Sequence, residues 1–529
     1  MALMTSDSGR DTFGNNLNQR VLKISRFLPI AVLCLVSFCV YYNAISNGFV
    51  YDDVTQVVNN PWMRDVGYLH DIFTKDVWSF KSRTASNYYR PLMHVIYMFD
   101  YHVFGLRPWG FHLVNILFHA SNTALVFLLA SRLLREDPGS LYARYPDTAF
   151  FSVPFVAALL FATHPIHTEA VAWISGIPDL SSSFFFLLSL YLYFRSGAKL
   201  NRDYLFSVVS FFFAALCKEP ALTLPIILAA YDYSFKKGGV RLSDFFKRYI
   251  PFLAVGAVYL VMRFNALGQF APDRGHTDLS VYQCVINVFP LFIQYLGKLL
   301  FPVNLNASYV VHPLASLLEA KGILSLICAA GVVIASFIAF QKNKVAFFSI
   351  LLVVVPLLPV LYIPVLIVNI FAERYLYLSS AGFVILPALL LFWVTRTYPP
   401  MAAVLTVGFV ILMGLFFIGT VDRNAVWKDD YTLWSDTVKK SPDGAVAHLN
   451  FGQAIQVRGD RDGAIEHYRI SIRLDPNDPV AHFDLGLAFF LKGRMDLAVE
   501  QFRIVLSQDP NYPDTAYYLQ LASASMSHR

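Results

Sequence analysis

The chain has 529 residues, of which 56% are hydrophobic and only 15% are charged. An ordinary soluble domain carries about 25% charged residues, so this composition indicates a polytopic membrane protein. The formal net charge is +6 and the Lys and Arg residues form no long run, which argues against a nucleic-acid partner. All five cysteines lie inside apolar runs and show neither a disulfide framework nor metal-ligand spacing.

The N-terminal segment is polar, and basic residues precede the first apolar run, which covers residues 27–42. Basic flanks favour the cytoplasmic side of a membrane, so we predict a cytoplasmic tail over residues 1–25 and an uncleaved first span. The alternative is a cleaved signal peptide, because Ala44 and Ser46 are small residues of the kind found at cleavage sites.

A polar and aromatic stretch follows this run and opens with the segment Asn47-Gly-Phe-Val-Tyr-Asp-Asp53. A carboxylate pair is costly in hydrocarbon, so we expect Asp52 and Asp53 in the aqueous interface or in a wet cavity. The alternative is that the pair begins a turn or caps the next helix. We predict an outer loop over residues 46–90, followed by an amphipathic helix over residues 91–104.

Ten further apolar runs follow between residues 111 and 420, and several are shorter than the ~20 residues of a full span. The basic stretches between them all fall on the cytoplasmic side if about eleven helices cross and residues 282–300 do not. That segment contains Asn287 and Pro290, and we predict a re-entrant or surface-lying helix. The predicted fold class is therefore all-α, with a polytopic helical membrane domain over residues 26–420.

The last part of the chain carries a repeated pattern. Pro442, Pro476 and Pro510 recur at a spacing of 34 residues. A Pro at the end of each 34-residue unit, with small residues where two helices cross, is typical of tetratricopeptide repeats. Two full repeats with one flanking helix on each side predict an α-solenoid over residues 421–529, on the outer side. Such a solenoid offers a concave peptide-binding surface; the alternative is a lid or a dimer contact.

Five polar clusters interrupt the apolar sequence, and the predicted topology places all of them on the outer side. They are Asp52/Asp53, Tyr88-Tyr-Arg-Pro91, His164-Pro-Ile-His-Thr-Glu169, Lys218-Glu-Pro220 and Glu373-Arg-Tyr-Leu-Tyr377. An unpaired charge beside an apolar run is costly, so these groups should pair with one another or line a cavity. Their convergence on one face of the bundle predicts a functional site.

His164, His167 and Glu169 are the residues with metal-ligating chemistry. Their spacing differs from the HExxH pattern, and Pro165 disturbs any regular helix there. Buried histidines that hydrogen-bond to a partner are the alternative. A divalent metal therefore stays open, and no cofactor is assigned.

Cationic residues in the clusters are candidates for binding phosphate. Arg90 and Arg374 are the best of these, because a guanidinium group binds phosphate through two hydrogen bonds. The alternative for Arg374 is a salt bridge to Glu373. Lys218 and Glu219 either form an intramembrane ion pair that holds two helices together or bind substrate.

The same motifs carry a resemblance to one family. They are Asn47-Gly-Phe-Val-Tyr-Asp-Asp53, Tyr89-Arg-Pro-Leu92, Phe111-His-Leu-Val-Asn115, the segment from His164 to Trp173, Glu373-Arg-Tyr-Leu-Tyr377 and the Trp427/Trp434 helix before the repeats. With them, nearly the whole chain resembles the transmembrane and tetratricopeptide-repeat proteins of the GT-C glycosyltransferase superfamily, relatives of the protein O-mannosyltransferases. Animal members carry longer repeat arrays, and this short array resembles the bacterial members.

The resemblance implies a sugar donor on polyprenyl phosphate, with mannose as the family-level sugar, and transfer with inversion at the outer or lumenal membrane face. It also implies that an acidic residue of the first outer loop acts as general base, which by position is Asp53 or Asp52. Neighbouring side chains of an extended segment point opposite ways, so one of the two is the base, and we predict Asp53. Arg90, Lys218 and Arg374 are then the candidates for holding the departing lipid phosphate.

We therefore predict a GT-C-type membrane glycosyltransferase whose repeats recruit a protein or peptide acceptor. The predicted substrate-binding residues are His164, His167, Glu169, Glu219, Glu373 and Tyr375. The expected location is a bacterial inner membrane with the repeats in the periplasm; the alternative is an endoplasmic reticulum membrane with the repeats in the lumen. Two other functions stay open, namely a non-catalytic membrane scaffold and a hydrolase of polyprenyl-phosphate sugars. A transporter is disfavoured because the charges gather on one side.

Overall fold

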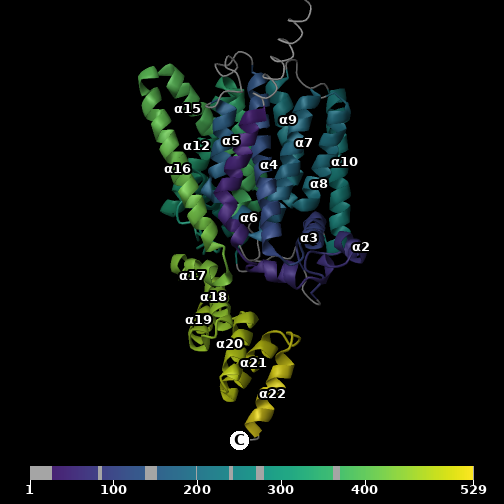
Figure 1. The fold of residues 1–529 in the computed structure, drawn as a ribbon, viewed down its shortest axis with the longest axis vertical. Helices are drawn as coiled ribbons and strands as arrows, with labels where there is room; N and C mark the ends of the chain where they lie inside the picture. Colours follow the sequence, from purple (N-terminus) through teal and green to yellow (C-terminus); the bar gives the residue numbers. More distant parts are fainter. Residues whose placement is uncertain are drawn as a thin grey trace, which may run out of the picture.

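A computed structural model describes residues 27–81, 86–137, 152–197, 199–236, 242–269, 279–361 and 370–527. These residues form helices and connecting segments and contain no strand. Long helices stand side by side in a bundle, and a smaller stack of helices projects from one end of it (Figure 1). The predicted all-α fold class is confirmed.

The bundle contains the helices that are long and apolar enough to cross a membrane. In the described ranges nine helices meet this condition, and a tenth is added if the bent pair Val153–Thr163 and Pro165–Ala172 is counted as one span. After a first helix that belongs to Phe27–Ser46, the bundle helices are α4 (Pro108–Arg135), α5 (Val153–Thr163), α6 (Thr168–Ala172), α7 (Ile177–Ser196), α8 (Arg202–Cys217), α9 (Leu224–Phe235), α10 (Leu242–Leu267), α11 (Val281–Leu300), α12 (Ala320–Lys342), α13 (Lys344–Leu357), α14 (Leu376–Phe383), α15 (Ile385–Thr397) and α16 (Ala402–Val426).

The structure differs from the predicted set of spans at three helices. The α8 and α9 helices have 16 and 12 residues, so each is shorter than a usual span, although both pack within the bundle. The α11 helix, which we predicted to be re-entrant or surface-lying, is continuous over 20 residues and apolar enough to span. Pro290 lies inside α11 without breaking it.

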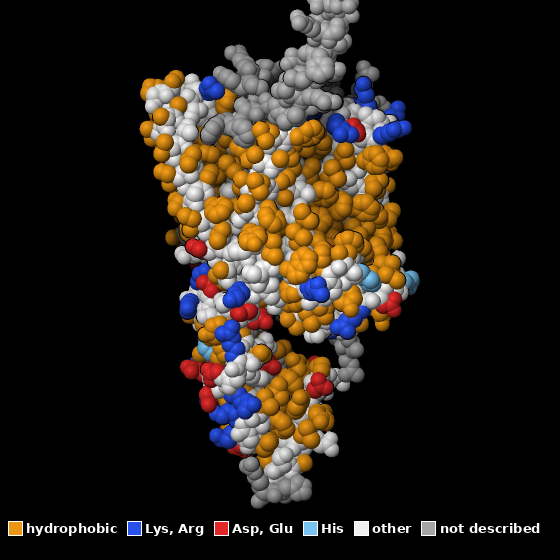
Figure 2. Space-filling model, viewed as in Figure 1, with side chains coloured by type: hydrophobic (Ala, Val, Ile, Leu, Met, Phe, Trp, Pro, Cys, Tyr) orange, Lys and Arg blue, Asp and Glu red, His pale blue; other side chains and the backbone are white. Residues whose placement is uncertain are grey.

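The distribution of apolar and charged side chains on the surface is that expected for a bundle inside a bilayer. Figure 2 shows a broad band of apolar side chains over the bundle, whereas charged side chains gather at its ends and on the repeats. Because a large exposed apolar belt is not stable in water, the chain is a membrane protein.

Several bundle helices break at the polar clusters of the sequence. The α5 helix ends at Thr163, where His164 is extended and Pro165 begins a short 3-10 turn. The α8 helix ends before Lys218, which is also extended and precedes a 3-10 turn over Glu219–Thr223. Proline lacks the N–H that would continue a helix, so Pro165 and Pro220 account for both breaks.

The loop after the first helix forms a compact layer at one end of the bundle. Its helical turns are η1 (Tyr42–Ser46), η2 (Val54–Val58), η3 (Pro61–Met63), η4 (Val66–Tyr68), α2 (Leu69–Thr74) and α3 (Pro91–Phe104). The predicted helix over residues 91–104 coincides with α3. The α2 and α3 helices lie at the end from which the repeats project (Figure 1).

In the C-terminal stack, equivalent contacts between helices recur every 34 residues. Its helices are α17 (Asp430–Lys440), α18 (Ala445–Val457), α19 (Arg461–Leu474), α20 (Pro479–Leu491), α21 (Met495–Gln508) and α22 (Thr515–Ser527). A methyl group on Gly452 would lie 2.6 Å from the Tyr468 ring, and one on Gly486 would lie 2.8 Å from the Phe502 ring. Glycine is therefore required at both helix crossings, as predicted for tetratricopeptide repeats.

Candidate functional site

The backbone just before the two carboxylates is strained. Tyr51 has a φ angle of 53°, which is uncommon for a bulky residue. Its N–H donates to Asp430 Oδ1 at 2.8 Å, and its ring stacks on Trp173 and meets the edge of Trp434. Contacts from the bundle and from the repeats together hold this conformation, which is a common feature of functional sites.

Asp53 is fully buried and completely engaged. Its Oδ2 accepts a hydrogen bond from the Val50 N–H at 3.0 Å, and its Oδ1 accepts from the N–H and the hydroxyl of Ser175 at 2.8 and 2.5 Å. Burial raises the pKa of Asp53 to about 7, although these hydrogen bonds lower it. The carboxylate therefore ties the outer loop to the turn before α7.

Asp52 is partly exposed and lines a cavity of about 540 Å³ between the outer loop and the first repeat helices. Burial raises the pKa of Asp52 to about 6, and the positive charges of Arg374 and Lys81 act in the opposite direction. The sequence predicts an extended segment here, and this is wrong: Asp52 and Asp53 begin a helical turn. Successive side chains of a helical turn point about 100° apart, so one carboxylate faces the cavity while the other is buried.

Arg374 and Lys218 each pair with a buried carboxylate. The Arg374 guanidinium contacts Glu169, and its backbone N–H donates to Glu169 Oε2 at 2.9 Å. Lys218 Nζ lies 2.5 Å from Asp179 Oδ1, and both side chains are less than 10% exposed. The predicted alternative of an Arg374–Glu373 salt bridge is wrong, because the helix break at residues 164–168 brings Glu169 to Arg374 instead.

Glu219 is shared by two arginines. Arg90 Nη2 lies 2.9 Å from Glu219 Oε2, and Arg263 Nη1 lies 3.4 Å from Glu219 Oε1. Glu219 thus pairs with Arg90, which precedes α3, and with Arg263 of α10 rather than with Lys218, so the predicted alternative of a Lys218–Glu219 pair is also wrong. Sequence reasoning missed Arg263, although a lone Arg near the end of an apolar span was a usable signal.

These groups belong to one cation-rich cluster. Lys218 interacts electrostatically with Arg90 and with Arg374. The Tyr375 ring lies 4.7 Å from Lys218 Nζ and 5.0 Å from Arg374 Cζ. The cluster contains four cations and three carboxylates, which gives a net charge of +1; its members are Arg90, Lys218, Arg263, Arg374, Glu169, Asp179 and Glu219. All three predicted phosphate-binding cations are therefore brought together.

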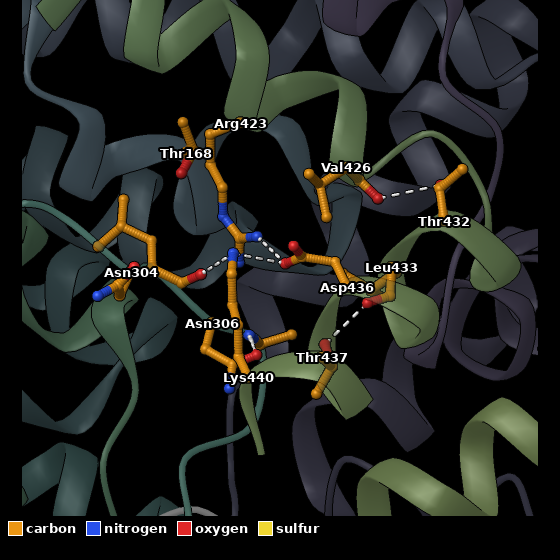
Figure 3. Close-up of polar contacts among 12 residues, drawn as sticks. Thr168, Asn304, Asn306, Arg423, Val426, Thr432, Leu433, Asp436, Thr437 and Lys440 are labelled. Atoms are coloured by element: carbon orange, nitrogen blue, oxygen red, sulfur yellow. Dashed lines mark hydrogen bonds and ion pairs between the residues drawn. The ribbon is translucent and has the colours of Figure 1, made fainter. Parts of the chain in front are cut away.

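Glu373 belongs to a different cluster, at the junction with the repeats. Its Oε1 accepts from the Asn306 N–H and the Tyr309 hydroxyl, each at 2.5 Å. In the same region Arg423 Nη1 lies 2.6 Å from Asp436 Oδ2, and Lys440 reaches the same carboxylate at 2.8 Å (Figure 3). The sequence reasoning did not single out Arg423, Asp436 or Lys440.

The two histidines of the third cluster have separate partners. His164 Nε2 lies 3.0 Å from the Leu299 carbonyl oxygen, and His167 Nε2 lies 2.7 Å from Ser380 Oγ. Both rings are buried, and Glu169 is occupied by Arg374. Among the residues that the structure describes, no three side chains form a group that could hold a metal ion. The contacts match the alternative of buried, hydrogen-bonded histidines.

Known proteins resemble both parts of the chain. The tetratricopeptide-repeat family model matches residues 442–513. A protein O-mannosyl-transferase of Caenorhabditis elegans is 28% identical over 84% of this chain and 62% of its own length. The human protein O-mannosyl-transferases TMTC3 and TMTC1 are 26% and 28% identical, over 83% and 84% of this chain.

The chain spans about half of the length of these two human relatives, 50% of TMTC3 and 55% of TMTC1. The similarity to the C. elegans protein extends over 454 residues, which is longer than either the bundle or the repeats alone. The chain therefore combines a bundle of membrane-spanning helices with tetratricopeptide repeats, and over most of its length it is similar to proteins named protein O-mannosyl-transferases.

Proposed function

We propose that this chain is an integral membrane glycosyltransferase that moves a sugar, mannose by its resemblance, from a polyprenyl-phosphate donor to a protein hydroxyl. The observation that carries the proposal is the position of Asp52, which lines a cavity and interacts electrostatically with Arg374 of the cation-rich cluster. A base and a phosphate-binding group must lie close together for such a transfer. The names of the relatives support the same reaction.

In the proposed reaction, Asp52 accepts the proton of the acceptor hydroxyl while that oxygen attacks the anomeric carbon. The bond from this carbon to the phosphate oxygen breaks on the opposite face, and the sugar is transferred with inversion. The lipid phosphate departs as an anion, so it needs positive charge rather than an acid. Arg90, Lys218 and Arg374 supply this charge, and the net charge of +1 in their cluster favours an anionic ligand.

Asp52 is the better candidate for the base, although we predicted Asp53 from the sequence. Both carboxylate oxygens of Asp53 accept hydrogen bonds from the protein, and its side chain is fully buried. Asp52 lines the cavity that an acceptor can enter. We propose that Asp53 positions the loop and that Asp52 takes the proton.

The test is transfer from radiolabelled polyprenyl-phosphate sugars to extracted envelope proteins by the purified full-length chain. We expect Asp52→Asn to lose about 100-fold or more of the rate, which is the usual contribution of a general base. Asp71→Asn is the matched control, because Asp71 lies in the same outer loop and pairs with Lys75. Release of free sugar without labelled protein would support the hydrolase instead. No turnover with any donor, while the chain still captures a protein partner, would support the scaffold.

We place the reaction on the side of the membrane that carries the repeats, in a bacterial inner membrane with the repeats facing the periplasm. The alternative is an endoplasmic reticulum membrane with the repeats in the lumen. Protease added to intact spheroplasts should cleave the repeats if they face the periplasm. Protection of the repeats until the membrane is opened would contradict this orientation.

A further inference from the structure

The cavity at Asp52 has two walls that come from distant parts of the chain. The outer loop supplies one wall, and α17 and α18 supply the other. Its lining residues include Phe49, Tyr51, Asp52, Tyr431, Gln453 and Val457. The cavity therefore joins the proposed base directly to the repeats.

Hydrogen bonds attach the outer loop to the end of α16, to the segment after it and to the start of α17. Gly48 N–H donates to the Lys428 carbonyl oxygen at 2.9 Å, and Asn47 Nδ2 donates to the Asn424 carbonyl oxygen at 3.0 Å. Tyr51 N–H donates to Asp430 Oδ1 at 2.8 Å. Three bonds within five residues of the loop make the cavity a built feature of the junction.

The charges in the cavity favour a cationic occupant. Its charged lining residues are three aspartates, Asp52, Asp429 and Asp430, and one arginine, Arg458, so the net charge is −2. Arg458 lies 3.3 Å from Asp429 and stacks over Tyr431. Among the described residues no salt bridge is formed to Asp52 or Asp430, although the more distant charges of Arg374 and Lys81 act on Asp52 and one oxygen of Asp430 accepts the Tyr51 N–H. Burial raises the pKa of both, and a bound cation would relieve that penalty.

The other lining groups fit a polypeptide. The side-chain amides of Asn450 and Gln453 are of the kind that hydrogen-bond a peptide backbone, and Val457 is 89% exposed as an apolar contact. No group of three acidic or histidine side chains in the described part of the chain could hold a metal ion, which argues against a metal cation as the occupant.

We infer that this cavity is the acceptor groove and that it selects a polypeptide segment with Lys or Arg beside the Ser or Thr that receives the sugar. The inference rests on the proposed function for the identity of the acceptor. Asp52 would meet the hydroxyl, while Asp430 and the open part of the groove would meet the basic side chain. Specificity for positive charge is thereby built into the junction rather than into the repeats alone.

The test measures binding separately from transfer, by fluorescence anisotropy with the full-length protein in nanodiscs and without donor. The probes are a Ser peptide flanked by Lys and a peptide of equal length flanked by Glu. We expect the Lys peptide to bind at least about fivefold more tightly, with an advantage that falls as salt screens the charges.

Charge exchange at Val457 makes the test specific for the groove. Because Val457 is 89% exposed, Val457→Arg and Val457→Glu should both fold. We expect Val457→Arg to weaken binding of the Lys peptide about fivefold and Val457→Glu to strengthen its binding. Leu491→Arg is the matched control, because Leu491 is a half-exposed leucine at the end of α20 and lies outside the groove lining.

Equal binding of the two peptides, or identical effects of Val457→Arg and Leu491→Arg, would overturn the groove assignment. If protein transfer is still observed then, the proposed function stands without this inference. Charge-selective binding that depends on Val457, in a chain that transfers no sugar, would support the groove and count against the proposed enzyme.

Discussion

Asp52 and Asp53 are consecutive residues, but their carboxylates have different environments. Tyr51 adopts a left-handed conformation, and the turn that follows buries Asp53 while Asp52 reaches the cavity. Single substitutions should therefore separate chemistry at Asp52 from folding at Asp53.

The pH dependence of transfer should report on Asp52. Its pKa is about 6, so below pH 6 the carboxyl is protonated and cannot accept the proton of the acceptor. We expect kcat/KM to rise about tenfold per pH unit below 6 and to level off above it. The measurement is a pH–rate profile of the purified chain between pH 4.5 and 8. A rate that stays constant across this range would exclude Asp52 as the base.

Asp53→Ala should reduce stability more than any exposed substitution in the loop. The change leaves the N–H groups of Val50 and Ser175 without their acceptor inside the protein. We expect a loss of about 2–6 kcal/mol, because each of the two buried donors left unpaired costs about 1–3 kcal/mol. Thermal unfolding in detergent measures the loss, and Asp65→Ala in the exposed part of the same loop is the comparison. Equal midpoints for the two variants would refute the structural role of Asp53.

At the level of helices, the breaks rather than the regular spans carry the polar chemistry. Thr163 and Cys217 end two helices, and His164 and Lys218 begin the turns that follow. The α10 helix adds Arg263 to this set from inside a helix that is long and apolar enough to span. Each of these elements contributes a charged group to one end of the bundle.

Arg263→Gln tests whether the surplus positive charge binds the donor. Without Arg263 the cluster has three cations and three carboxylates, and its net charge falls from +1 to zero. We expect the KM for the polyprenyl-phosphate donor to rise about tenfold, the effect of one charge-assisted hydrogen bond. Arg396→Gln, near the end of α15, removes the same charge from outside this cluster and should leave KM unchanged. An unchanged KM in Arg263→Gln would mean that Arg263 only supports Glu219.

For the whole molecule, the contacts between the bundle and the repeats decide whether the groove exists. Arg423 lies near the end of α16 and pairs with Asp436 of α17 (Figure 3). Lys440 also donates to the loop carbonyl of Leu305 at 2.8 Å. These contacts involve the second half of α17, whereas the hydrogen bonds of Gly48 and Tyr51 reach Lys428 and Asp430 at its start. The repeats are thus attached to the bundle by two sets of contacts.

Asp436→Asn should loosen the repeats from the bundle. Arg423 is only 7% exposed in its side chain and would lose its charged partner on α17, a loss of about 1–3 kcal/mol. We expect limited proteolysis to release the repeats faster and transfer to fall, because the two walls of the groove separate. Asp496→Asn removes the same charge from an exposed pair with Arg494 and should change neither rate. Unaltered proteolysis of Asp436→Asn would show that the other set of contacts suffices.

The sequence by itself determined the class of fold and the residue types of the candidate site. Apolar runs of helical length, the 34-residue period and the helix-breaking prolines are local patterns, so they predicted the bundle, the repeats and the breaks. Unpaired charge is costly beside hydrocarbon, which correctly suggested that Arg90, Lys218 and Arg374 converge.

Only the tertiary structure decided which charges pair and which carboxylate faces the cavity. Glu169 with Arg374, Asp179 with Lys218 and Glu219 with Arg263 are each far apart in sequence, and no local pattern encodes such partners. The difference between Asp52 and Asp53 likewise depends on Asp430 and Trp434, which hold Tyr51 from more than 370 residues away. The salt-bridge partners and the directions of these side chains follow from packing between distant parts of the chain. Local sequence patterns do not show which distant parts pack together.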